Sequence, residues 1–162
     1  MTTQTKTAKP LTAITALVIT AVLTALTLVF TAFVNIRLPI TANGGLVHLG
    51  NVPLFIGAVI FGKRVGAISG GLGMALFDVL SGWTLWAPFT LITVAAMGYA
   101  VGAIAHNRDK YRYYILALIA ALVVKIAGYY IAEVIIYQNL IAPAASIPGN
   151  VDQVGLAGIV VL

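Results

Sequence analysis

The stretch that decides the fold is the first long apolar run, LTAITALVITAVLTALTLVFTAFV, at Leu11–Val34. About 20 apolar residues in a helix cross the roughly 30 Å hydrocarbon core of a bilayer, and this run exceeds that length. It is too long for the apolar core of a signal peptide, and no small-residue cleavage site follows it. The run therefore predicts a first transmembrane helix over residues 11–34.

The composition of the whole chain agrees with a lipid environment. Of the 162 residues, 61% are hydrophobic and 8% are charged, whereas a soluble domain typically carries about 25% charged residues. Nine basic and four acidic side chains cannot cover a 16.9 kDa globule in water. A soluble fold is excluded, and we expect an all-α integral membrane protein. The absence of cysteine also excludes disulfides, thiol catalysis and thiolate metal sites.

Turn residues and charges divide the chain into apolar segments that predict a bundle of six transmembrane helices in one membrane domain, residues 1–162. The predicted spans are 11–34, 46–62, 65–80, 89–105, 113–137 and 150–162. Thirteen residues of helix cover only about 20 Å, so the sixth span is expected to be incomplete.

The basic residues predict the orientation of the bundle. Seven basic residues are expected in terminal or loop segments on one side of the membrane: Lys6, Lys9, Lys63, Arg64, Arg108, Lys110 and Arg112. The loops on the opposite side contain one basic residue, Arg37. Cytoplasmic loops carry an excess of Lys and Arg, so both termini are expected in the cytoplasm. The net charge of +5 thus reports topology, and no nucleic acid partner is expected.

Polar side chains in the spans fall at mid-membrane or nearer the outer face. Lys125, Tyr129, Glu133 and Tyr137 are spaced by four and share one helical face. An ionisable group inside a bilayer is costly unless it is paired, and it is a functional candidate by default. Two interpretations remain open: a polar ligand pocket open to the outside, or charges that pair only to hold helices together.

Two tryptophans in the predicted outer loop at 81–88 extend this pattern. They are either interfacial belt residues or flat faces on which a ligand ring stacks. The candidate substrate-binding residues are Trp83, Trp86, Lys125, Tyr129, Glu133, Asn150, Gln153, Asn43, His48, Asn51 and Asp78.

Enzymatic chemistry is not expected. Gly57–Arg64 (GAVIFGKR) nearly matches a phosphate-binding loop, but Arg64 stands where the magnesium-binding Ser or Thr is needed. Paired histidines for haem or metal are also missing from the spans, since only His48 lies in one. We therefore expect no catalytic residue, no cofactor and no metal ion.

Small residues four apart allow close approach of helices. Such pairs occur at Ala21 and Ala25, at Gly66 and Gly70, and at Gly98 and Gly102. Most such pairs pack a bundle internally, but one of them could face a partner protein.

Three segments together resemble the substrate-capture S components of energy-coupling factor (ECF) vitamin transporters: NGGLVHLGN (Asn43–Asn51), GAISGGLGMALFD (Gly66–Asp78) and GWTLWAPFT (Gly82–Thr90). The resemblance runs from about residue 11 onward and is strongest at 43–102. It implies a six-helix bundle in the bacterial plasma membrane that binds a vitamin or precursor near the outer face. It also implies docking onto a membrane coupling (T) subunit joined to two ATPase subunits, through Ala21 and Ala25 on the first helix.

The polar and aromatic inventory favours a small heteroaromatic ligand. A hydroxymethylpyrimidine or pyridoxine-like compound fits best and riboflavin second, with the loop Ile36–Gly45 as a lid. The alternative function is a self-sufficient small proton-coupled permease or exporter, with Glu133 or Asp78 as the coupling carboxylate. A structural subunit without a ligand is a third hypothesis.

Overall fold

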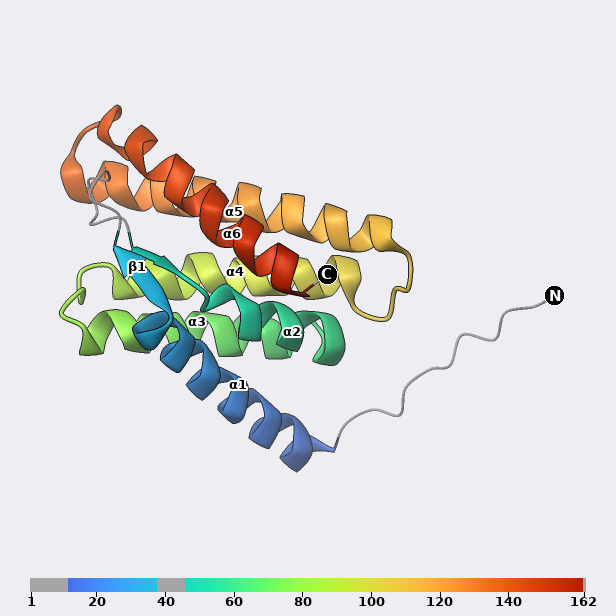
Figure 1. Ribbon diagram of the computed structural model, residues 1–162. Helices are drawn as coiled ribbons and strands as arrows, with labels where there is room; N and C mark the ends of the chain where they lie inside the picture. Colours follow the sequence, from blue (N-terminus) through green and yellow to red (C-terminus); the bar gives the residue numbers. More distant parts are fainter. Residues whose placement is uncertain (1–11, 38–45, 162) are drawn as a thin grey trace.

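The computed structural model describes residues 12–37 and 46–161, and these are almost entirely helical (Figure 1). This confirms the helical class predicted from sequence. The α-helices are α1 (Ala13–Phe33), α2 (Asn51–Phe61), α3 (Lys63–Leu80), α4 (Ala87–Ala105), α5 (Tyr111–Tyr137) and α6 (Ile147–Val161), with a 3-10 helix η1 (Ala142–Ser146) before α6.

Three of these helices, α1, α4 and α5, are long and apolar enough to cross a membrane. They expose large apolar side chains on the outside of the bundle, such as Ile14 and Phe33 on α1, as expected of surfaces that contact lipid. Helix α2 has 11 residues and is therefore only about 16 Å long. Further membrane crossings stay a prediction.

A short antiparallel hairpin corrects the predicted start of the second span. Strand β1 (Asn35–Arg37) pairs with β2 (Leu46–His48), with Asn35 opposite His48. Residues 46–48 are therefore a strand, and the helix begins only at Asn51. Pairing in the hairpin satisfies backbone groups that a helix start would leave open. The chain turns from β2 into α2 at Gly50, where a Cβ atom would overlap the Thr31 hydroxyl.

Four helices begin two or three residues before their predicted starts. Gly62 has a φ of 95°, a conformation that glycine adopts without strain, so α3 resumes directly after α2. Pro88 and Pro148 lie in the first turns of α4 and α6, although the sequence pattern assigned both to loops. Proline is well tolerated there because the first N–H groups of a helix have no intrahelical partner.

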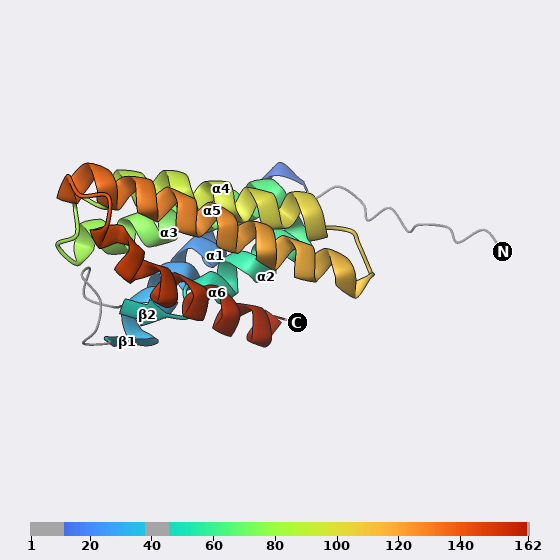
Figure 2. The same ribbon diagram turned by 90° about the horizontal axis from the view of Figure 1, so that it is seen from above.

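The connections segregate to the two ends of the bundle (Figures 1 and 2). The hairpin, the α3–α4 loop and the α5–η1 connection lie at one end, here called the hairpin end. The α2–α3 and α4–α5 turns lie at the other end, with the start of α1. This second end, here called the basic end, carries Lys63, Arg64, Arg108, Lys110 and Arg112.

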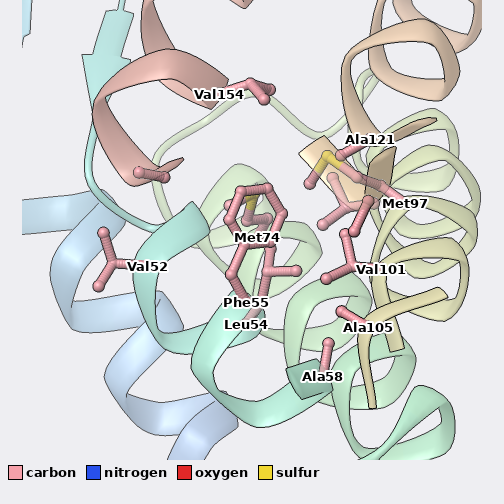
Figure 3. Packing of buried hydrophobic residues seen from close by; sticks show 13 residues of the cluster. Val52, Leu54, Phe55, Ala58, Met74, Met97, Val101, Ala105, Ala121 and Val154 are labelled. Atoms are coloured by element: carbon pink, nitrogen blue, oxygen red, sulfur yellow. The ribbon is translucent and has the colours of Figure 1, made fainter. Parts of the chain in front are cut away.

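Helix α2 lies at the centre of the apolar core (Figure 3). Its side chains are apolar in nearly every direction, and a helix of that kind is stable only when surrounded. Leu54 and Phe55 are almost completely buried. They pack in one cluster with Met74 of α3 and with Met97 and Val101 of α4.

The glycine pairs on α3 and α4 pack against each other. A Cβ atom at Gly98 would overlap the backbone of Gly66, and one at Gly102 would overlap the backbone of Lys63. These glycines therefore bring two helix backbones together inside the bundle. Ala21 and Ala25, in contrast, are exposed on α1.

Candidate functional site

A cavity of about 100 Å³ lies toward the hairpin end of the bundle. Its walls come from every helix except α2, together with β2 and the α3–α4 loop. The lining residues are Thr31, His48, Met74, Phe77, Asp78, Trp83, Trp86, Thr90, Lys125, Tyr129, Ser146, Gly149, Asn150 and Gln153.

Most of the residues singled out from sequence meet at this cavity. Those on its wall are Trp83, Trp86, Lys125, Tyr129, Asn150, Gln153, His48 and Asp78. Glu133 and Asn51 are fully buried and are not among the lining residues. Asn43 lies outside the described residues.

Lys125 supplies a positive charge inside the bundle. It is 2% exposed, and its Nζ donates a 2.6 Å hydrogen bond to Oε1 of Gln153 on α6. The same ammonium lies 5.8 Å from the centroid of the Tyr129 ring. A lysine ammonium has three N–H donors, and the hydrogen bond to Gln153 goes to a neutral amide. The group can therefore donate to an acceptor on a bound molecule.

Glu133 lies behind the cavity wall. Its Oε2 accepts a 2.7 Å hydrogen bond from the hydroxyl of Ser146, which does line the cavity. The bond fixes η1 against α5. Glu133 is therefore connected to the cavity through Ser146 and does not line it itself.

Asp78 presents an acceptor that is not in use. Its Oδ2 is buried and has no hydrogen-bond partner in the described part of the chain. Thr90 of α4 lies beside this carboxylate at the cavity wall. Its Oγ1 accepts a 3.3 Å hydrogen bond from the Tyr129 hydroxyl. The three side chains bring α3, α4 and α5 together at one side of the cavity.

A tight turn places the two tryptophans at the cavity. The backbone N–H of Trp83 donates to the backbone carbonyl of Asp78 at 2.7 Å, and the backbone N–H of Trp86 donates to the backbone carbonyl of Trp83 at 2.8 Å. Gly82, directly before Trp83, adopts a φ of 85°. Trp86 also meets Tyr137 edge to face, with ring centroids 6.0 Å apart. Both indoles are half-buried, so each offers an aromatic face to the cavity region.

His48 contributes from the hairpin. Its Nδ1 accepts a 3.2 Å hydrogen bond from the Gly50 N–H. The neutral ring then carries its proton on Nε2. His48 can therefore offer an N–H donor to the cavity that it lines.

Six lining residues were not predicted: Thr31, Met74, Phe77, Thr90, Ser146 and Gly149. Four of them stand four residues from a predicted site residue: Met74 before Asp78, Thr90 after Trp86, Ser146 before Asn150 and Gly149 before Gln153. The i, i+4 relation would have indicated these four. Thr31 carries no such signal, because the packing of α1 brings it to the cavity.

Asn51 is a separate feature at the start of α2. Its amide nitrogen and oxygen are both buried and have no hydrogen-bond partner among the described residues.

The described residues contain no group of three or more His, Cys, Asp or Glu side chains that could hold a metal ion.

Comparison with known proteins gives a consistent set of relatives. Residues 12–162 match the model of the family described as ECF-type riboflavin transporter, S component. The chain is 32% identical over 121 residues to the thiamine precursor transporter HmpT of Lactococcus lactis subsp. cremoris, covering 75% of this chain and 68% of that protein. It is 33% identical over 102 residues to an uncharacterized protein in the gap 3' region of Pyrococcus woesei, covering 63% of this chain and 68% of that protein.

Proposed function

Because the chain belongs to the family of ECF-type riboflavin transporter S components, we propose that it captures a small water-soluble vitamin or vitamin precursor in the cavity at the hairpin end. The chain is the binding subunit, and ATP is hydrolysed by its partners. The observation that carries this proposal is a cavity that joins aromatic faces to buried hydrogen-bonding groups.

The ligand that fits the cavity best is a hydroxymethylpyrimidine. Its flat ring suits the aromatic faces of Trp83, Trp86 and Tyr129. Its amine and ring nitrogens suit a wall that has an acceptor at Asp78 and a donor at Lys125. The similarity to a thiamine precursor transporter supports this ranking above a pyridoxine-like compound and above riboflavin.

The proposal includes a membrane topology of six crossings in a single domain over residues 1–162. The separation of the two ends supports it, because the basic side chains gather at one end and the cavity lies toward the other. With the basic end in the cytoplasm, both termini are cytoplasmic and the cavity opens near the outer face. The membrane is the bacterial plasma membrane.

The partners are a membrane coupling subunit and two ATPase subunits. Ala21 and Ala25 support docking on α1, because they are exposed small residues one turn apart and allow a partner helix to approach closely. The glycine pairs of α3 and α4 are already used inside the bundle, so α1 presents the small-residue pair that is open to a partner.

Titration of tryptophan fluorescence tests the proposal directly. The chain has two tryptophans, and both line the cavity, so the signal has no background from elsewhere. Purified protein is titrated with hydroxymethylpyrimidine, pyridoxine, thiamine and riboflavin. Saturable quenching by one of them without ATP or a proton gradient is expected.

A flat response to all four ligands from a folded sample contradicts the proposal. Proton-driven transport by the chain alone in proteoliposomes would then support the small-permease alternative. Trp83→Phe and Trp86→Phe assign the signal to individual indoles.

A further inference from the structure

The acceptor side of the cavity is built around one unused oxygen. Oδ2 of Asp78 is buried and has no partner among residues 12–37 and 46–161, and Asp78 lines the cavity. A buried carboxylate oxygen is expensive to leave unsatisfied. Its position at a cavity wall means that a bound molecule can supply the missing donor.

The groups around this carboxylate leave that oxygen available. The Tyr129 hydroxyl donates its single proton to Thr90 Oγ1. Thr90 lies beside Asp78 at the cavity wall, and Oδ2 still has no partner among the described residues. The Lys125 ammonium is held toward Gln153 by its own hydrogen bond.

We infer that Asp78 sets ligand specificity by accepting a hydrogen bond from an amino group on the ligand ring, a deeper reading that rests on the proposed function. The residue selects amino-substituted heteroaromatic rings and rejects rings that carry a carbonyl at the same edge. A carbonyl would place its lone pairs against the carboxylate oxygen and leave that oxygen without a donor. Sites that hydrogen-bond one group of a ligand discriminate strongly against analogues that lack it.

The test compares two probes that differ at one substituent: 4-amino-5-hydroxymethyl-2-methylpyrimidine and the analogue with a carbonyl in place of the amine. Binding is followed by tryptophan fluorescence. Wild-type protein is expected to prefer the amino compound by at least about tenfold. Asp78→Asn is expected to lose most of this preference, because its amide offers both an acceptor and an N–H donor.

Two further variants separate the role of Asp78 from a general loss of structure. Asp78→Glu keeps a carboxylate and is expected to retain the preference even where overall affinity falls. Asp152→Asn removes an exposed aspartate of α6 and should leave both affinities unchanged. Thermal melting of each variant establishes that it is folded.

The outcomes distinguish this inference from the proposed function. Equal binding of the two pyrimidines by wild type, or an unchanged preference in Asp78→Asn, overturns the role of Asp78 and leaves the vitamin-capture proposal standing. Binding of another vitamin with no binding of either pyrimidine overturns the assignment of an amino-substituted ring. No binding of any vitamin overturns both.

Discussion

The ammonium group of Lys125 donates a 2.6 Å hydrogen bond to the side-chain carbonyl of Gln153, and this bond joins α5 to α6 at the wall of the cavity. The partner of this buried cation is a neutral amide. A charge held in this way is costly inside a membrane bundle unless a further acceptor is supplied. We therefore expect a ligand that supplies an acceptor to Lys125 to strengthen the α5–α6 contact.

Replacing Lys125 with methionine is expected to weaken ligand binding by about 1–3 kcal/mol, because it removes a charge-assisted donor from the cavity wall together with its hydrogen bond to Gln153. Isothermal titration calorimetry measures the affinity. Lys110→Met, at an exposed position of the basic end, is the control and should bind as wild type does. Full affinity in Lys125→Met would show that the ligand does not use the ammonium.

Glu133→Ala is expected to weaken binding, because the carboxylate that holds the Ser146 hydroxyl is lost. Glu133→Gln keeps an acceptor for Ser146 and is expected to retain most of the affinity. A double-mutant cycle with Ser146→Ala should give a coupling free energy of about 0.5–3 kcal/mol. Glu133→Gln also tests the permease alternative, which requires it to abolish proton-coupled transport while binding persists.

Leucine at Ala21 or Ala25 is expected to abolish uptake by the complete transporter while ligand binding by the isolated chain stays unchanged. Both positions are exposed on α1, so the larger side chain disturbs only a partner that packs closely there. Uptake of labelled ligand into cells and fluorescence titration measure the two properties. Ala127→Leu, at an exposed position of α5, is the matched control. Lost binding in a folded Ala21→Leu protein contradicts the docking role.

Gly98→Ala is expected to lower the thermal stability of the detergent-solubilised protein, because its Cβ atom would overlap the backbone of Gly66. Overpacking of this kind costs about 1–3 kcal/mol. Gly155→Ala is the control, since a Cβ atom there meets none of the described residues within 4 Å and alanine has the higher helix propensity. A shared melting temperature for the two variants would argue against close α3–α4 packing.

The sequence by itself determined the helical membrane class, the approximate limits of most helices and the sites of the basic turns. These properties depend on local apolar runs, and a run of about 20 apolar residues has few other stable states. The four-residue spacing of Lys125, Tyr129 and Glu133 likewise predicted a common face of α5. The segments at 43–51, 66–78 and 82–90 also indicated the family to which the chain belongs.

Only the tertiary structure decided what each of these faces meets. The packing joined Ser146 to Glu133 by a hydrogen bond, placed His48 in a hairpin where a helix was predicted, and brought Thr31 to the cavity. It also turned the glycines of α3 and α4 inward while Ala21 and Ala25 stayed exposed. Helical periodicity states which residues share a face, but the rotation and crossing of packed helices decide whether that face meets a neighbour, a cavity or lipid.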